Sequence, residues 1–337
     1  MSTPLLELRN VTKIFGSKTE YTVALDDMTL AFDENLPKII AVVGESGSGK
    51  TTTGMLLLGF YGPTMGQALF RGKPLSELKG PDLFQFRREV QAVFQDPFAV
   101  YNPFYKVDNL LSIPIKNFKL ADSKAGARDL MEDALERVGL RPEETLGRYP
   151  HQLSGGQRQR IAVARALLLK PKFLVTDEPV SMVDASLRST ILKSLRAMNQ
   201  EFGIPILYIT HDLTTAYHIS DYIIILYRGS VMEAGDVDSI IRDPHHPYTK
   251  LLVSSIPWPN PELSWGGTEE MIQKSQVAFK AITGCKFAPR CPYRMDICDT
   301  KAPELFRPQN NRVVACYLNR DNEVLSRADL SKVFAEA

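Results

Sequence analysis

The 337-residue chain lacks a surplus of charge of either sign. Lys and Arg total 40 and Asp and Glu total 39, so the formal net charge is +1 at pH 7. Proteins that bind nucleic acid through its phosphates usually carry a basic surplus on the binding domain. The balance of charges therefore argues against nucleic acid as a partner.

Long hydrophobic runs are missing as well. A helix needs about 20 mostly apolar residues to cross a bilayer, whereas the longest apolar candidates are residues 39–43 and 222–227. Segments of this length and composition are typical of buried β-strands. The N-terminal residues MSTPLLEL also lack the basic region and apolar run of a secretory signal. We therefore expect a cytosolic protein that reaches a membrane only through partner proteins.

Cysteine is absent from most of the chain, and the cysteines present lie close together near its end: Cys285, Cys291, Cys298 and Cys316. Their spacing lacks the paired C-x-x-C units of structural zinc sites, and disulfides are rare in cytosolic proteins. Thiolates clustered in a region with little core suit a metal centre that replaces packing. Four cysteines fit a four-iron four-sulfur cluster. Zinc and free buried thiols stay open as alternatives, because spacing does not determine geometry.

What the chain does contain is an alternation of short apolar segments and amphipathic ones. The apolar segments predict strands, and the hydrophobic positions of the others recur at helical spacing. The predicted strands are residues 5–11, 28–32, 38–43, 89–94, 172–176, 206–210 and 222–227, and the predicted helices are residues 51–59, 125–138, 157–169 and 187–202. Strands that alternate with helices predict an α/β fold with a mostly parallel, covered sheet.

Four of the predicted strands end at residues that are suited to chemistry. These residues are Gly44, Gln95, Asp177 and His211. In parallel sheets with helices on both faces, ligands bind at the carboxyl ends of the strands. We therefore expect the four residues to belong to one site.

Residues 44–51, GESGSGKT, match the phosphate-binding pattern G-x-x-x-x-G-K-[ST], between a predicted strand and a predicted helix. The glycines permit a tight loop whose N–H groups wrap phosphates, Lys50 reaches the β- and γ-phosphates, and the Thr51 hydroxyl binds Mg²⁺. An ordinary Gly/Ser turn is the competing interpretation, which the context disfavours. The predicted nucleotide-binding residues are Gly44, Glu45, Ser46, Gly47, Ser48, Gly49, Lys50, Thr51 and Thr52.

Two acids follow the apolar strand predicted at residues 172–176. We predict that Asp177 binds Mg²⁺ through water and that Glu178 polarises the attacking water, because phosphoryl transfer depends on positioning and electrostatics. Gln95 is expected to ligate Mg²⁺ and to sense the γ-phosphate, and His211 is a further catalytic candidate. Each of them alone is more often a solvated loop or turn residue. Their occurrence together with the phosphate loop favours the functional interpretation.

Residues 153–157, LSGGQ, lie at the start of another predicted helix. A helix start offers unpaired N–H groups and the positive end of the helix dipole, which suit a phosphate. The chain thus carries a second predicted phosphate-contacting loop. Its residues are Ser154, Gly155, Gly156 and Gln157.

These motifs, in this order and spacing, resemble an ATP-binding cassette (ABC) ATPase over roughly residues 5–235. The residues that carry the resemblance are 44–51, Gln95, 153–157, 177–178, 181–184 and His211. It implies a P-loop NTPase fold with a mostly parallel sheet, an antiparallel β subdomain and an inserted helical subdomain. It also implies a head-to-tail dimer in which each ATP lies between one subunit's phosphate loop and the other's LSGGQ.

By this resemblance, residues 154–157 serve the partner's nucleotide and Asp184 lies in a loop that crosses the dimer interface. Phe15 looks like the aromatic residue that stacks on adenine, with Tyr21 as the other candidate. The chain departs from the family's pattern at Thr176, where an apolar residue is usual, and at 182–183, where Met-Val replaces Ala-Leu. Neither departure removes a catalytic group, so we expect a competent site.

The C-terminal part resembles the extension of oligopeptide/dipeptide-type import ATPases, at residues 246–252 (HPYTKLL) and 284–292 (GCKFAPRCP). That group is associated with an iron–sulfur cluster. The Pro-rich residues 256–261 predict a linker. The expected domains are a cassette at 1–255, with a helical insert at about 96–160, and a cysteine-containing extension at 256–337. QDPFA at 95–99 and PVS at 179–181 are more similar to the second, F-type, ATPase of such systems.

The resemblance implies a cytosolic ATPase subunit of an ABC importer for peptides, nickel or oligosaccharides, bound peripherally to the inner face of the membrane. Its expected partners are an identical or homologous ATPase, in a homodimer or heterodimer, two transmembrane permease subunits and an extracytoplasmic solute-binding protein. The expected cofactors are ATP, Mg²⁺ and a four-iron four-sulfur cluster.

Two other functions are weighed against the importer. The first is a soluble ABC ATPase that remodels a macromolecular complex, and the insert length, single cassette and C-terminal extension argue against it. The second is a nucleotide-sensing module without catalysis, which the intact Glu178 and His211 disfavour.

Overall fold

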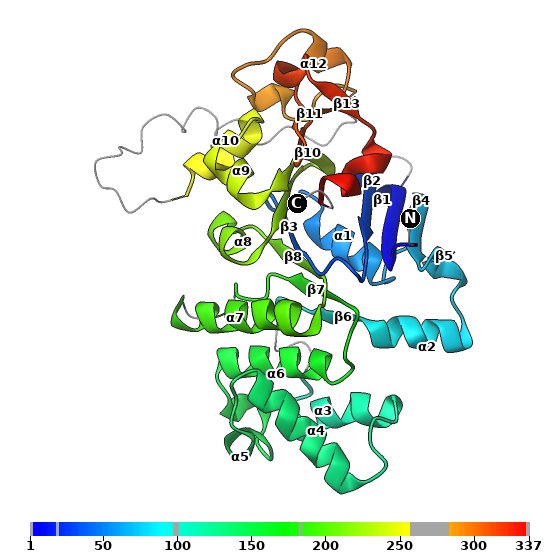
Figure 1. Cartoon of the computed structure of the whole chain (residues 1–337), viewed down its shortest axis with the longest axis vertical. Helices are drawn as coiled ribbons and strands as arrows, with labels where there is room; N and C mark the ends of the chain where they lie inside the picture. Colours follow the sequence, from blue (N-terminus) through cyan, green and yellow to red (C-terminus); the bar gives the residue numbers. More distant parts are fainter. Residues whose placement is uncertain are drawn as a thin grey trace. The chain divides into compact units, whose positions relative to one another are not determined.

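The computed structural model describes residues 3–17, 20–96, 101–181, 183, 185–256 and 283–334. It contains two compact units (Figure 1), of which unit one comprises residues 1–77 and 208–337 and unit two comprises residues 78–207. Among the described residues, no helix is both long enough and apolar enough to span a membrane.

Unit one begins with an antiparallel sheet. Its strands are β1 (Leu6–Gly16), β2 (Tyr21–Phe32), β4 (Met65–Phe70) and β5 (Lys73–Pro74), in the order β2-β1-β4-β5. Leu6, Leu8 and Val11 of β1 are buried, whereas Phe15 near the end of the strand is exposed. The strands predicted at 5–11 and 28–32 are therefore parts of two longer strands, and this sheet is the antiparallel β subdomain that the resemblance implies.

A second, mixed sheet in unit one positions the phosphate loop. Its strands are β3 (Ile39–Val43), β9 (Tyr222–Tyr227), β10 (Ser230–Asp236), β12 (Arg312–Val314), β11 (Leu305–Gln309) and β13 (Glu323–Leu325), adjacent in that order. β3 and β9 are parallel, and the other neighbours are antiparallel. Every residue of β3 and β9 is buried, which explains their continuous apolar composition.

The strands after residue 283 extend this same sheet. β12 pairs with β10, placing Glu233 opposite Val314 and Gly235 opposite Arg312. Arg312 is almost completely buried, and its guanidinium donates hydrogen bonds to the backbone carbonyls of Asp243 and Ser239. These donations, together with the Glu233 carboxylate 4.0 Å from Arg312 Nε, offset part of the cost of burying the charge.

Short helices complete the described part of unit one. They are α1 (Lys50–Leu57), α8 (Leu213–Ile219), α9 (Val237–Arg242), α10 (Pro247–Ser254) and α12 (Ile297–Thr300), with 3₁₀ turns η1 (Leu75–Glu77), η3 (Ala288–Arg290), η4 (Tyr317–Asn319) and η5 (Arg327–Phe334). Three of the helices begin with a side-chain cap, which satisfies N–H groups at the helix start. The capping residues are Asp212 for α8, Asp236 for α9 and His246 for α10.

Unit two consists of helices around a short parallel strand pair, β6 (Val90–Val93) and β7 (Phe173–Asp177). Its helices are α2 (Gly80–Glu89), α3 (Val107–Asn117), α4 (Lys124–Arg137), α5 (Pro142–Thr145), α6 (Gly155–Leu167) and α7 (Ala185–Phe202), with the 3₁₀ turn η2 (Pro150–Gln152). Helices α3, α4 and α6 contact one another, and each carries buried apolar residues, among them Leu111, Leu135 and Ile161. They form the helical part that the resemblance implies.

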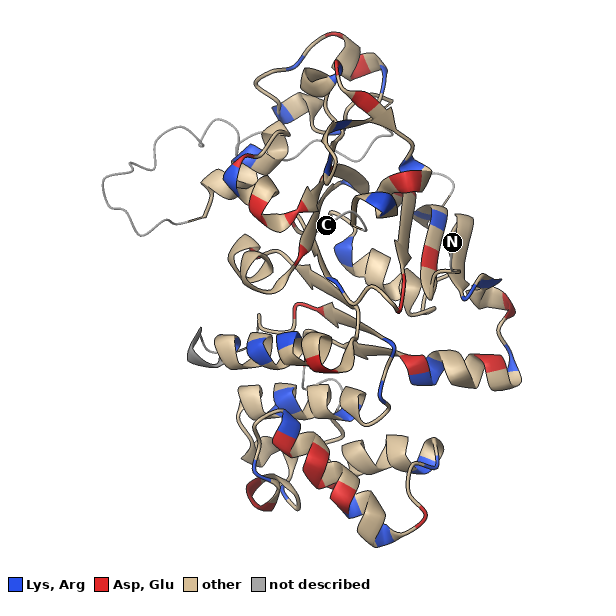
Figure 2. Cartoon of the chain, in the orientation of Figure 1, with Lys and Arg blue, Asp and Glu red and all other residues tan. Residues whose placement is uncertain are grey.

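Acidic and basic side chains are mixed along α4 rather than separated (Figure 2). Arg128 pairs with Glu132 and Arg137 pairs with Asp133, each one helical turn apart. Exposed pairs of this kind contribute little to stability.

Most predicted elements agree with the structure to within two residues. β3, β6, β7 and β8 (Ile206–Thr210) match the predicted strands closely. Helix α6 begins at Gly155 instead of Gln157, because Ser154 caps it and the two glycines already adopt helical backbone. The predicted linker at 256–261 lies almost entirely outside the described residues.

Candidate functional site

The phosphate loop joins the end of β3 to the start of α1 and depends on two glycines. Gly49 has a φ of 104°, and a Cβ there would lie 2.3 Å from the carbonyl oxygen of Ala24. A Cβ on Gly44 would lie 2.1 Å from the carbonyl oxygen of Leu226. Because no Cβ fits at these distances, the loop's tight path requires glycine at both positions.

Lys50 is the buried centre of this loop. Its ammonium donates to the carbonyl oxygens of Gly44 at 2.8 Å and Glu45 at 2.9 Å. The loop also closes on itself through a hydrogen bond from Ser48 N–H to the Glu45 carbonyl, at 3.1 Å. Ser46, Gly47 and Thr51 are exposed around it. The arrangement presents N–H groups, a helix start and a cation to one anion, which is the chemistry that binds phosphates.

His211 follows β8 in unit one and is exposed. It does not cap the helix that begins after it, because Asp212 performs that function by accepting from Thr214 N–H at 2.8 Å. The capping role that a histidine often has in a turn therefore belongs to Asp212 here, and the His211 side chain lies at the surface.

The two candidate adenine-stacking residues lie at the β1–β2 hairpin end. Gly16 pairs with Tyr21, and Phe15 pairs with Thr22. The Phe15 ring contacts the Tyr61 ring edge-on, with centroids 5.3 Å apart, and the Lys13 ammonium lies 4.9 Å from the Phe15 centroid. Tyr61 is a half-exposed aromatic residue that the sequence did not single out, since it lies in an irregular segment without periodicity.

Asp177 and Glu178 lie together at the end of β7 in unit two. Asp177 is buried and ends the strand, and Glu178 has a φ of 48°, a left-handed conformation that is uncommon for a residue with a side chain. Ser181 stabilises this turn by donating its N–H and hydroxyl to the Glu178 carbonyl, at 3.2 and 3.0 Å. Such strained turns are often found at functional sites.

The departure at Thr176 has a local explanation. Its side chain is fully buried, and its hydroxyl donates to the Leu207 carbonyl at 3.3 Å. The hydroxyl is therefore satisfied within unit two. Met182 and Asp184 lie outside the described residues, whereas Val183 is buried and its carbonyl accepts from the Arg188 side chain at 3.0 Å.

Gln95 follows β6 and is exposed, and the next described residue after Asp96 is Tyr101. Two contacts from α6 anchor this segment. The buried amide of Gln159 donates to the Phe94 carbonyl at 3.3 Å, and Tyr101 donates its hydroxyl to the Arg158 carbonyl at 2.8 Å. Gln159 lies two residues after LSGGQ, and the sequence analysis assigned it only to the predicted helix and not to a contact with residue 94.

The LSGGQ segment forms a capping box. Ser154 Oγ accepts from Gln157 N–H at 3.2 Å, and Gln157 Oε1 accepts from Ser154 N–H at 2.9 Å. Leu153 is buried and anchors the loop, while Ser154 is exposed. The box fixes the start of α6, with Ser154 at the surface and Gly156 buried.

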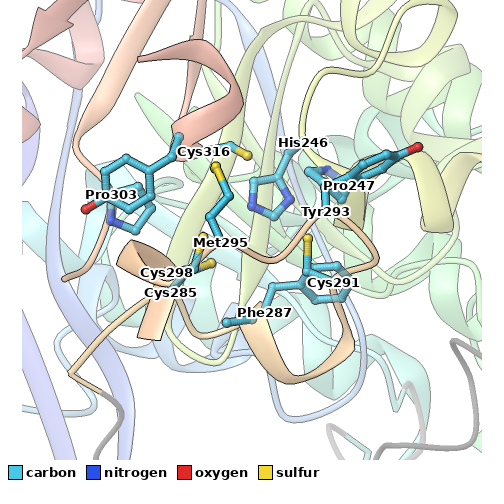
Figure 3. A pocket seen from close by; sticks show the side chains of 12 residues that line it. His246, Pro247, Cys285, Phe287, Cys291, Tyr293, Met295, Cys298, Pro303 and Cys316 are labelled. Atoms are coloured by element: carbon cyan, nitrogen blue, oxygen red, sulfur yellow. The ribbon is translucent and has the colours of Figure 1, made fainter. Parts of the chain in front are cut away.

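All four cysteines line one cavity in unit one (Figure 3), together with His246, Phe287, Met295 and Tyr317. Cys285 N–H donates to the Cys298 carbonyl at 2.7 Å, which joins two of the cysteine segments. Burial raises the pKa of Cys285 to about 11 and that of Cys316 to about 12, and it also raises the pKa of Cys291. Among the described residues, no three His, Cys, Asp or Glu side chains are arranged as a metal site.

His246 is a polar side chain of the cavity to which the sequence analysis gave no role. Burial lowers the pKa of His246 to about 3, so the ring is neutral. Its Nδ1 accepts from Tyr248 N–H at 3.0 Å, which places the ring proton on Nε2. Nε2 is buried and has no hydrogen-bond partner among the described residues. Such an unsatisfied donor is costly unless a ligand accepts from it.

Comparison with known proteins gives two family matches. The model for ABC transporters matches residues 25–181, and the model for the C-terminal region of oligopeptide/dipeptide transporters matches residues 232–298.

Curated relatives match nearly the whole chain. A putative oligopeptide transport ATP-binding protein of Bacillus subtilis, YkfD, is 39% identical over 323 residues, which covers 95% of this chain and 97% of the relative. A putative peptide import ATP-binding protein of Brucella ovis is 38% identical, covering 95% and 99%. The oligopeptide transport ATP-binding protein AppF of Bacillus subtilis is 36% identical, covering 93% and 97%.

Solved structures resemble the same part of the fold. The ATP-binding cassette MJ0796, a dimer in a post-hydrolysis state bound to ADP and Pi, has a TM-score of 0.62 and 29% identity, covering 69% of this chain and 98% of that one. The protein cbiO1 of Clostridium perfringens, part of an ABC transporter complex, has a TM-score of 0.62 and 26% identity, covering 72% and 92%.

Proposed function

This chain belongs to the ABC transporter family, in the group with the oligopeptide/dipeptide transporter C-terminal region, and we propose that it is the ATP-hydrolysing subunit of an importer of peptides or a related solute. The observation that carries the proposal is the closed phosphate loop around Lys50, in a chain 39% identical to a putative oligopeptide transport ATP-binding protein. The related solutes are nickel and oligosaccharides, and a separate binding protein and the membrane subunits would select the solute.

In unit one we assign residues 44–52 to the phosphates of ATP, with Lys50 opposite the β- and γ-phosphates. The exposed Thr51 hydroxyl is the proposed Mg²⁺ ligand of this unit, since Mg²⁺ prefers oxygen donors. Phe15 is the proposed adenine-stacking residue because Tyr61 and Lys13 brace its ring, with Tyr21 as the alternative. His211 is assigned to the γ-phosphate.

In unit two we assign Asp177 and Gln95 to Mg²⁺ and Glu178 to the attacking water. Bound Mg²⁺ would supply charge neutralisation on the transferred phosphoryl group. The left-handed turn at Glu178 supports its role, because it redirects the chain directly after the buried strand end. A carboxylate at this position would orient the attacking water and accept its proton.

Residues 154–157 are proposed to contact the nucleotide of a second cassette rather than that of their own chain. Ser154 and Gln157 hydrogen-bond to each other in the capping box, and these bonds fix the conformation of the helix start. Asp184 is assigned to the same dimer interface. We propose that the second cassette is a homologous chain, in a heterodimer, with an identical chain as the alternative.

The remaining partners follow from the proposed importer. We propose two transmembrane permease subunits, an extracytoplasmic solute-binding protein and peripheral attachment at the inner face of the membrane. The domain division at residue 255, with a helical insert at about 96–160, is part of the same proposal.

For the cysteine cavity we propose a four-iron four-sulfur cluster held by Cys285, Cys291, Cys298 and Cys316. Two observations support the proposal, although no three of the described side chains are arranged as metal ligands: all four cysteines line one cavity, and the unpartnered Nε2–H of His246 is a hydrogen-bond donor for sulfur in the same cavity. The cluster would supply cross-links in place of packing, since ATP hydrolysis needs no electron transfer.

Iron and sulfide analysis of anaerobically purified protein, with its charge-transfer absorbance, tests the cluster. Iron and sulfide in equal amounts are expected. Zinc without iron would establish the zinc alternative, and neither metal would leave four free thiols.

Purification of the tagged chain from membranes tests the importer. Two permease subunits and a second ATPase are expected to co-purify, and ATP turnover in the complex should depend on the added solute-binding protein. Recovery without membrane subunits, in a soluble complex with other macromolecules, would contradict the importer and favour remodelling.

A further inference from the structure

Arg290 joins the cysteine region to the phosphate loop. Its guanidinium makes a two-pronged ion pair with the Glu45 carboxylate, with Nη1–Oε2 at 2.9 Å and Nη2–Oε1 at 3.0 Å. Both residues belong to unit one, although 245 positions separate them in the sequence. The Arg290 side chain is only 6% exposed, compared with 40% for Glu45. Paired geometry of this kind is directional, so it fixes the position of the carboxylate as well as its charge.

Arg290 is placed by the turn that carries two of the cysteines. Ala288 N–H donates to the Cys285 carbonyl, Arg290 N–H to the Phe287 carbonyl, and Cys291 N–H to the Ala288 carbonyl, at 3.0, 3.0 and 3.2 Å. The guanidinium carbon lies 5.6 Å from the Phe287 ring centroid. The guanidinium is therefore held by packing, and a movement of Cys285 or Cys291 would move it.

Glu45 is the residue of the phosphate loop through which such a movement would act. Its carbonyl accepts from the Lys50 ammonium at 2.9 Å and from Ser48 N–H at 3.1 Å. Its own N–H donates to the Tyr248 hydroxyl at 2.9 Å. The side chain, N–H and carbonyl of one residue are thus all engaged, and the carbonyl supports the lysine that is assigned to the phosphates.

The Tyr248 contact is a second route from the same cavity. Tyr248 N–H donates to Nδ1 of His246, and His246 lines the cavity with the four cysteines (Figure 3). The rings of Tyr248 and Phe287 are also packed, with centroids 5.4 Å apart. Both anchors of Glu45 therefore begin at residues that surround the cysteines.

We propose that the cysteine region is a positioning device for the phosphate loop, in which Arg290 fixes Glu45 and so makes the chain's ATP affinity depend on the arrangement of Cys285 and Cys291. Arg290 acts through Glu45 and Lys50 and does not touch the nucleotide itself. The inference rests on the proposed binding of ATP by residues 44–51.

ATP affinity of Arg290→Ala tests the positioning role in the full-length protein. We expect the dissociation constant of a fluorescent ATP analogue to rise about tenfold, because the loop loses its fixed carboxylate. Arg290→Lys keeps the charge but cannot make both hydrogen bonds to Glu45, so its dissociation constant should lie between those of the unaltered chain and Arg290→Ala. Arg294→Ala is the matched control, because Arg294 is an exposed arginine of the same region that pairs with Asp299, and its affinity should be unchanged.

A second variant separates positioning from folding. Glu45→Gln leaves the residues of the cysteine turn unaltered and should reproduce the loss of affinity, and urea unfolding of both variants corrects for the stability that each loses with the ion pair. If Arg290→Ala and Glu45→Gln both bind the analogue like the unaltered chain, the positioning role is wrong. If the unaltered chain itself fails to bind ATP, the proposed function fails instead, so the two failures are distinguishable.

Dependence on the cysteines is tested by combining variants. Cys291→Ser should weaken analogue binding in the unaltered background and add no further loss in the Arg290→Ala background, because both changes act on one route. Equal losses in both backgrounds would show that Cys291 acts independently of Arg290, which would overturn the coupling.

Discussion

The two loops that we assign to phosphates differ in how many of the groups that bind an anion each one contains. The phosphate loop of unit one encloses a buried lysine, closes on its own carbonyls and is fixed by Arg290 and Tyr248. The LSGGQ loop of unit two has only a capping box, with a neutral Ser–Gln pair at its surface. The phosphate loop contains its own cation, Lys50. The five residues of LSGGQ include no cation.

This difference indicates a division of labour. The dipole of a helix start alone contributes only roughly 0.3–1 kcal/mol to the binding of an anion. This agrees with the proposed assignment, in which the LSGGQ loop contacts the nucleotide of a second chain. The following predictions test this division, beginning with the largest expected effect.

The largest effect is expected from Glu178→Gln. ATP turnover should fall about 10³-fold, because the amide cannot accept the proton of the attacking water. ATP should still bind to unit one, and the bound nucleotide should accumulate with two cassettes joined through LSGGQ. Turnover assays and ATP-dependent size-exclusion chromatography measure the two results. Glu201→Gln, a matched change at an exposed glutamate of α7, should behave like the unaltered chain; normal turnover in Glu178→Gln would refute the assignment of the base.

The next effect is expected from Gly49→Ala, which breaks the enclosed loop. Its Cβ would lie 2.3 Å from the Ala24 carbonyl at a φ of 104°. We expect a loss of about 2–3 kcal/mol in unfolding free energy and at least about a tenfold loss in ATP affinity. Urea unfolding and analogue titration measure both. Gly203→Ala is the control, because it has a φ of 63° with nothing within 4 Å and should lose stability alone, by about 1 kcal/mol.

Acid should affect the support of the phosphate loop but not the capping box. Burial lowers the pKa of His246 from 6.5 to about 3, so the unfolded chain binds a proton that the folded chain refuses between these values. Stability therefore falls as the pH drops below about 6.5, by up to about 1.4 kcal/mol per pH unit from this residue. Ser154 and Gln157 do not titrate in this range.

Urea unfolding between pH 7 and 4 measures the histidine's contribution. His246→Asn should flatten the slope, whereas His218→Asn, at an exposed histidine, should leave it as it is. An unchanged slope in His246→Asn would mean that the buried histidine does not govern the acid response.

The smallest effect on stability is expected from Ser154→Ala. Loss of the cap should cost about 1 kcal/mol, and turnover of the assembled complex should fall roughly tenfold because the loop for the second nucleotide is no longer fixed. Ser123→Ala is the matched control, since Ser123 caps α4 by accepting from Gly126 N–H at 3.0 Å. It should lose similar stability and keep full turnover. An equal loss of turnover in both would attribute the effect to stability alone.

Local patterns in the sequence predicted the elements that carry the candidate site. The strand before Gly44, the helix after Lys50 and the strand that ends at Asp177 all have continuous or periodic apolar character, and the structure contains each of them. Leu-Ser-Gly-Gly-Gln likewise predicted a helix start, which the Ser154 cap establishes. These features depend on neighbours within a few residues, so the sequence carries a direct signal for them.

Contacts between distant segments had no such signal. Nothing in the sequence around Arg290 points to Glu45, and nothing around Val314 points to Glu233, because partners far apart share no periodicity. The clustering of cysteines did predict a common location, and the structure brings all four to one cavity. The role of His246 in that cavity depends on its burial and tautomer, which only the fold determines.

The pairing of β12 with β10 has a practical consequence for truncated versions of the chain. Residues 233–235 pair with 312–314 along one edge of β10. Ending the chain at residue 255 would remove that partner and leave an open strand edge next to the buried β9, and such edges recruit other chains. A cassette shortened to its ATP-binding part should therefore aggregate on purification. In the full-length chain, β12 of the C-terminal region protects this edge of the sheet by pairing with it.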